Sequence, residues 1–75
     1  MNLTEYKPKD KVKVMYIGAG ISARSKLNKM NIREDTELEL VTVQPFGGPI
    51  TVKVGSSEQT IGRGLAMKIG CEMID

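Results

Sequence analysis

Hydrophobic and polar residues alternate over Lys11–Ile17. Val12, Val14 and Tyr16 lie on one side of this segment, and Lys13 lies on the other. A period of two is typical of a strand with one buried face. The pattern therefore predicts a strand in which the two valines and the tyrosine face the core.

The period changes from two to about 3.6 in residues 21–30. Ala23, Leu27 and Met30 follow one another at spacings of four and three, which is typical of one face of a short amphipathic helix. Ser22 is a residue type that often caps a helix N-terminus. We therefore expect a helix here, with Ser22 as its N-cap.

A hairpin is indicated in the middle of the chain. Asn31 is expected to close the helix in a left-handed conformation, and residues 33–35 read as a turn. Residues 36–44 and Ile50–Val54 are rich in β-branched residues and are separated by the Pro- and Gly-containing cluster 45–49. This arrangement predicts two antiparallel strands joined by a tight loop.

The C-terminal third predicts shorter elements. Residues 58–61 are consistent with a short strand, and Ile61, Leu65 and Ile69 have the spacing of a helical stripe. Residues 71–74 are long enough for a last strand. The fold class that follows is mainly β: a small five-stranded antiparallel barrel with one or two short α-helices.

The chain has 75 residues, so it is expected to form one domain over residues 1–75. Hydrophobic residues make up 40% and charged residues 27%, with a net charge of +2, which is an ordinary globular composition. A core this small leaves little room for an enclosed active site. No nucleophile-base pair is visible either, so we expect a non-enzymatic protein that acts through its surface and needs no cofactor.

The sequence contains no His and a single cysteine, Cys71. Disulfides, Cys/His zinc sites and His-based triads are therefore excluded. The acidic residues Glu34, Asp35, Glu37 and Glu39 are interpreted as a solvated surface rather than a cation site, so no metal site is expected. With no signal peptide and no long apolar stretch, we expect a cytoplasmic protein without direct membrane insertion.

Two further patterns in the sequence allow a functional interpretation. The G-x-G-x-x-A run at 18–23 resembles a dinucleotide fingerprint, but no second parallel strand follows it. Residues 1–33 carry eight Lys/Arg against two Asp/Glu, and residues 34–75 carry three against seven, so charge is unevenly distributed. Stacking aromatics are few, so nucleic-acid binding is not expected.

Taken together, three segments resemble the FeoA family, the small cytoplasmic partner of the bacterial ferrous-iron transporter FeoB. They are residues 32–40 after the helix, residues 48–54 in the hairpin, and the sequence Ile-Gly-Arg-Gly-Leu-Ala-Met-Lys-Ile at 61–69. Asn31 and Asp35 depart from the pattern, because Gly is frequent at both positions. The resemblance implies an SH3-like barrel that docks on the cytoplasmic GTPase region of FeoB and modulates it. An iron-linked regulatory or nucleic-acid-binding barrel, like the C-terminal domain of DtxR-type repressors, is the alternative.

We expect the docking surface to combine the hairpin tip with the outward side of the first helix and one arginine of the closing motif. Phe46 is either an apolar anchor for the partner or a cap on the barrel end, and Arg63 either satisfies barrel carbonyls or contacts the partner. A weak homo-oligomer stays open. The expected partner-binding residues are Arg24, Asn28, Lys29, Pro45, Phe46, Gly47, Gly48 and Arg63.

Overall fold

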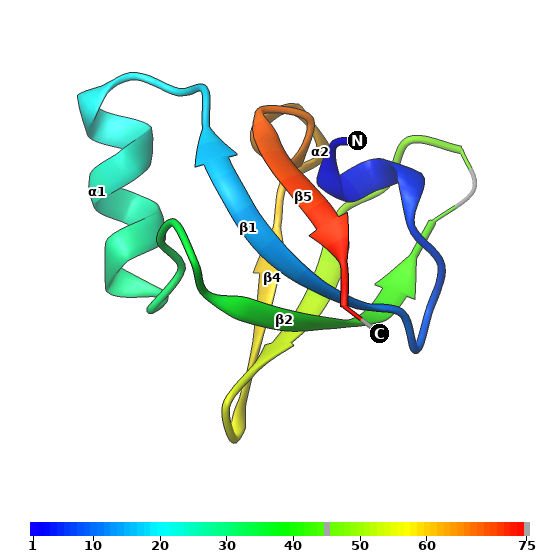
Figure 1. The fold of residues 1–75 in the computed structure, drawn as a ribbon. Coiled ribbons are helices and arrows are strands. Elements are labelled where there is room, and N and C mark those ends of the chain that lie inside the picture. Colours follow the sequence, from blue (N-terminus) through cyan, green and yellow to red (C-terminus); the bar gives the residue numbers. More distant parts are fainter. Residues whose placement is uncertain (45, 75) are drawn as a thin grey trace.

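The computed structural model describes residues 1–44 and 46–74. In this part, a short 3-10 helix precedes five strands and two α-helices. Figure 1 shows them in chain order: η1 (Leu3–Glu5), β1 (Lys11–Ile17), α1 (Ile21–Lys29), β2 (Glu37–Val43), β3 (Ile50–Val54), β4 (Ser57–Ile61), α2 (Arg63–Ala66) and β5 (Ile69–Met73).

The five strands form one antiparallel sheet in the order β4-β3-β2-β1-β5. The sheet is strongly curved, and α2 links the two edge strands β4 and β5 (Figure 1). Strand β2 runs antiparallel to β1, so the glycine run at 18–23 opens α1 without the parallel strand that a dinucleotide-binding unit requires. The mainly β architecture and the β2–β3 hairpin predicted from the sequence are confirmed.

The concave side of the sheet holds a single apolar core. Alternate residues of the strands point inward, and η1, α1 and α2 each add one buried side chain. Within the described residues no buried polar or charged residue interrupts this core. Its members are Leu3, Tyr6, Val12, Val14, Ile17, Leu27, Ile32, Leu38, Leu40, Ile50, Val52, Ile61, Ala66, Ile69 and Cys71.

A β-bulge in β1 changes which residues face the core. The register with β5 shifts between Val14 and Tyr16, so one extra residue is inserted on β1. Because side chains alternate along a strand, the insertion reverses the pattern. Ile17 is buried and Tyr16 is 61% exposed, so the predicted core position of Tyr16 is wrong.

The exposed Tyr16 ring covers a glycine on the neighbouring strand. Tyr16 pairs with Gly70 across β1 and β5. A Cβ at Gly70 would overlap the Tyr16 ring, and one at Gly18 would lie 3.8 Å from it. The glycine therefore lets an aromatic ring lie flat on the backbone of β5.

Helix α1 follows the predicted apolar stripe. Leu27 is fully buried, Met30 packs against the core, and Ala23 is half-buried. The helix begins two residues earlier than a Ser22 cap would allow: Gly20 is the N-cap, with no side-chain cap hydrogen bond. Asn31 adopts φ +63°, the left-handed conformation predicted for the residue that closes the helix.

The helical stripe predicted in the C-terminal third is wrong. Ile61 is the last residue of β4 and Ile69 the first of β5, so only four residues between them are helical. Both isoleucines pair across the sheet, Ile61 with Ile50 and Ile69 with Ile17. Apolar residues at a spacing of four can lie on one face of a helix, but they can also lie at the ends of two strands when glycines between them let the chain turn.

The N-terminal segment forms structure that the pattern did not predict. Asn2 and Glu5 make a capping box around η1. Asn2 bridges to Gly70, and Cys71 N donates to the Met1 carbonyl at 2.8 Å. This segment therefore covers part of the free edge of β5.

Within the described residues, no helix has the length and apolarity that a membrane crossing requires.

The contact between Gly70 and Tyr16 predicts a coupled effect on stability. Gly70→Ala should lower the free energy of unfolding by about 1 kcal/mol, because the ring must leave the strand. The melting temperature should fall by roughly 4–8 °C. Gly64→Ala is the matched control, because a Cβ there meets nothing within 4 Å. In a Tyr16→Ala background the Gly70→Ala cost should largely disappear; additive effects would show that the ring does not set the requirement for glycine.

Candidate functional site

The loop between β2 and β3 presents an aromatic side chain to solvent. Phe46 is 97% exposed. The backbone turns at Gly47 with φ +88°, and a Cβ at Gly48 would overlap the Gln44 side chain. Full burial of such a ring would contribute roughly 1.5–3 kcal/mol, which the isolated domain does not gain. The interpretation of Phe46 as a barrel cap is therefore wrong. Pro45 lies outside the described residues.

Arg63, at the start of α2, lies next to this loop. A Cβ at Gly47 would be 3.8 Å from Arg63 Cδ, so the arginine side chain packs beside the loop backbone. Arg63 Nη1 is buried and has no hydrogen-bond partner within residues 1–44 and 46–74. A buried charged donor without an acceptor costs free energy. The predicted structural role requires the guanidinium to donate hydrogen bonds to barrel carbonyls. In this part of the chain, Nη1 has no such acceptor.

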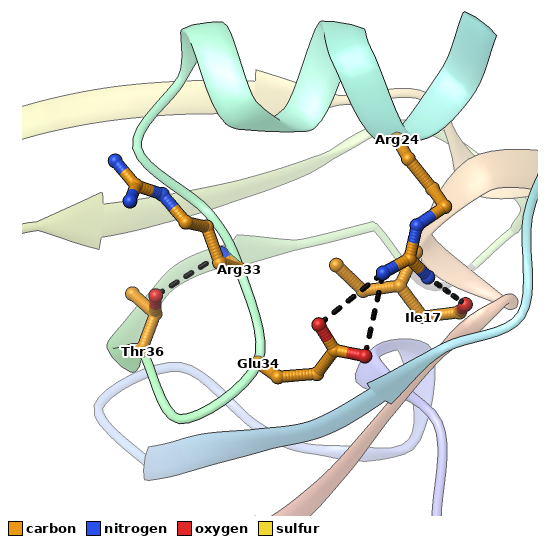
Figure 2. A network of polar contacts seen from close by, with 5 residues as sticks. All are labelled: Ile17, Arg24, Arg33, Glu34 and Thr36. Atoms are coloured by element: carbon orange, nitrogen blue, oxygen red, sulfur yellow. Dashed lines mark hydrogen bonds and ion pairs between the residues drawn. The ribbon is translucent and has the colours of Figure 1, made fainter. Parts of the chain in front are cut away.

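Arg24 makes structural contacts that the sequence did not predict. Its Nη1 donates to the Ile17 carbonyl at 2.7 Å, and its Nη2 donates to the Glu34 carboxylate at 3.3 and 3.4 Å (Figure 2). The guanidinium thus connects α1 to the end of β1 and to the turn before β2. Its side chain is still 41% exposed, and its contact with a partner stays a prediction.

The remaining two helix residues of the predicted surface, Asn28 and Lys29, are exposed. They belong to α1, which lies at the opposite side of the molecule from the β2–β3 loop in Figure 1. The structure therefore places Arg63 against Gly47, which follows Phe46 in the chain, and separates this loop from α1. The predicted surface that combines the hairpin tip with the helix would span two sides of the molecule, and its role in docking stays a prediction.

Two of the acidic residues that the sequence groups together are paired with cations. Glu34 pairs with Arg24, and Asp35 lies 3.8 Å from Lys13 Nζ. No group of three or more metal-ligating side chains occurs within residues 1–44 and 46–74. Burial raises the pKa of the Cys71 thiol to about 11, which disfavours the thiolate that binds metals and acts as a nucleophile.

Sequence reasoning missed a groove beside η1. Its lining includes Met1, Tyr6, Cys71 and Met73. None of these residues was singled out as a site, because residues 1–10 have no hydrophobic periodicity. The Asn-x-x-Glu pattern of the capping box was the available signal that this segment is ordered.

Comparison with protein families gives one family: the FeoA domain model matches residues 1–73. No curated protein sequence matches the chain. Among solved structures, a crystal structure of an iron uptake regulatory protein (FeoA) is 32% identical, with a TM-score of 0.91. The match covers 99% of this chain and 97% of that one. The SH3-like fold predicted from the sequence is thereby confirmed.

Two NMR structures are also similar. Iron(II) transport protein A from Clostridium thermocellum is 27% identical with a TM-score of 0.90, and the match covers 99% of this chain and 46% of that one. The FeoA-like protein from Clostridium acetobutylicum is 28% identical with a TM-score of 0.84, over 99% and 86% of the two chains. A manganese-dependent transcriptional repressor, 22% identical with a TM-score of 0.89 over 97% and 40% of the chains, shares the fold alone.

The contacts of Arg24 predict a loss of stability when its charge is removed. Arg24→Met should lower the free energy of unfolding by about 1 kcal/mol, because the Ile17 carbonyl and Glu34 lose a partly exposed charged partner. Thermal denaturation followed by circular dichroism measures the change. Arg33→Met is the matched control, since the hydrogen bond in Figure 2 uses the Arg33 backbone N–H and not its side chain. Equal melting temperatures for the two variants would contradict the structural role of Arg24.

Proposed function

Because this chain belongs to the FeoA family, we propose that it is a non-enzymatic accessory protein that docks on the cytoplasmic GTPase region of the FeoB transporter. The family match over residues 1–73 supports an accessory role in ferrous iron transport. The surface at the β2–β3 loop supports the further proposal that this protein docks on FeoB and modulates its activity.

The single observation that carries the docking proposal is the packing of Arg63 against the loop that presents Phe46. The loop exposes an aromatic ring, and its Gly47 lies next to an arginine whose Nη1 is buried and unpartnered in the described part of the chain. Aromatic and arginine side chains are the residues that most often dominate binding energy at protein interfaces. A partner carboxylate or carbonyl would give the guanidinium its acceptor, while an apolar pocket would receive the ring.

The proposed docking site is accordingly smaller than the sequence suggested. It consists of Phe46, Gly47, Gly48 and Arg63, which lie at one end of the curved sheet. Lys29 and Asn28 are on α1 at the other side, so they do not share one flat interface with the loop. The site is a compact aromatic and cationic contact rather than an extended basic surface.

The same site supports an interaction module better than a regulator of the repressor type. The metal-dependent regulators share only the fold, at 14–22% identity, with the SH3-like domain making up about a third to two fifths of each chain. That likeness carries no argument for nucleic-acid binding. The FeoA proteins are both more similar in sequence and similar over a larger share of their length.

Phe46→Ala tests the aromatic anchor. We expect it to weaken binding to the purified GTPase domain of FeoB about 30-fold, which corresponds to about 2 kcal/mol for an anchor residue. The melting temperature should be unchanged, because the ring makes no core contact. Isothermal titration calorimetry with GTP and with GDP measures the affinity, and Ile21→Ala is the control because Ile21 is also exposed but lies on α1. Unchanged affinity with reduced stability would reject this docking site.

Arg63→Met tests the guanidinium. The substitution keeps an unbranched stem but removes the charge, so affinity for the same domain should fall about tenfold, the loss of one charged hydrogen bond. Stability should not decrease, because Nη1 has no acceptor in the described part of the free protein. A lower melting temperature with unchanged affinity would instead assign Arg63 a structural role.

A further inference from the structure

A second surface of different chemistry lies beside η1. A groove of about 520 Å³ is lined by the N-terminal segment and by the last residues of β5. Tyr6 and Cys71 are buried and form its base, while the side chains of Met1 and Met73 are more than half exposed beside them. The groove therefore offers a mostly apolar base with two flexible thioether side chains, which adapt easily to an apolar ligand.

Hydrogen bonds hold the walls of this groove in place. The Tyr6 hydroxyl donates to the Cys71 carbonyl at 3.0 Å, and Cys71 N donates to the Met1 carbonyl at 2.8 Å. The capping box at Asn2 fixes the first turn of the chain. Because the walls are already ordered, a ligand would not have to bear the entropy cost of forming them.

Three carboxylates surround the apolar base. Glu5, Asp10 and Glu72 all line the groove, together with two cations: the Lys7 side chain and the N-terminal ammonium of Met1, which donates to the Cys71 carbonyl at 3.4 Å. Glu5 Oε2 accepts from Asn2 N at 2.7 Å and Asp10 Oδ2 accepts from a backbone N–H at 2.9 Å, so both carboxylates are held in position. Each keeps an oxygen that can accept further hydrogen bonds.

The electrostatics of the buried phenol agree with this arrangement. Burial raises the pKa of Tyr6 most, followed by the charges of Cys71, Glu5, Glu72 and Asp10. All three carboxylates thus act on the phenol at the base of the groove with the same sign. The three carboxylates outnumber the two cations among the lining residues, which disfavours phosphate-bearing ligands such as nucleic acids and anionic lipids.

We propose that this groove binds a short segment of another protein in which apolar side chains are flanked by lysine or arginine. The apolar residues would contact Tyr6 and Met73, and the flanking cations would pair with Glu72, Asp10 and Glu5. Charge complementarity selects this occupant over an acidic or a purely apolar segment. The surface is separate in chemistry from the Phe46 and Arg63 site, so it would allow a second contact beyond the docking proposed above.

The test uses the whole protein and a labelled synthetic peptide. The probe is a fluorescein-labelled peptide with two leucines between pairs of lysines, and fluorescence anisotropy follows its binding. Glu72→Lys should weaken binding about tenfold and Met73→Ser about fivefold, since they remove a rim charge and an apolar contact. The matched controls are Glu58→Lys and Met67→Ser, which should leave binding unchanged. Glu58 faces Lys53 across the sheet as Glu72 faces Lys13, and Met67 is similarly exposed outside the groove.

Several outcomes would overturn the proposal. One is that a peptide with glutamates in place of the lysines binds equally well, and another is that the lysine peptide does not bind. A third is that the groove variants and their controls have equal effects on binding. If the unliganded protein self-associates in sedimentation experiments and Glu72→Lys abolishes this, a second copy is the occupant and the proposed segment is not. Phe46→Ala should leave peptide binding unchanged, so failure here is distinguishable from failure of the FeoB docking proposal.

Discussion

The structure depends on one strand, β1, which pairs with β2 on one side and with β5 on the other. The β1–β5 pairing joins residues far apart in the chain, such as Val14 and Cys71. Closing so long a loop costs conformational entropy, which only the side chains buried between the paired strands can offset. The bulge in β1 then turns Ile17 into the core, and the Ile17 carbonyl accepts the hydrogen bond that fixes α1 through Arg24. The closure of the sheet and the position of α1 thus both depend on β1 and its bulge.

The core that this closure creates contains no buried charged side chain in the described residues. Two parts of the surface are candidates for partner contacts, and their chemistry differs. The β2–β3 loop exposes Phe46 and packs at Gly47 against Arg63, whereas beside η1 the core residue Tyr6 forms an apolar base that carboxylates surround. A small module of this kind can contact partners of different charge without a change in its fold.

Much of the fold could be predicted from the sequence, because strands, turns and helix closure depend on neighbouring residues. The left-handed Asn31, the β2–β3 hairpin and the stripe on α1 were all predicted from local patterns. Tyr16 was misplaced because a bulge arises from the match between two strands and not from either strand alone. The structural contacts of Arg24 were not predicted because its acceptor, the Ile17 carbonyl, is a backbone group that no residue pattern indicates.

The sequence by itself determined the fold class, the family and which sites the chain cannot form, namely those that need a histidine or a second cysteine. It contains no His and one cysteine, and its closing motif carries the likeness to the FeoA family. Only the tertiary structure decided which surface residues lie together. Gly47 lies against Arg63, and Tyr6 and Met73 line one groove, because pairings between strands distant in sequence bring these segments together. Local periodicity reports which side of an element faces the core, but the neighbours of an exposed side chain depend on the curvature and register of the whole sheet.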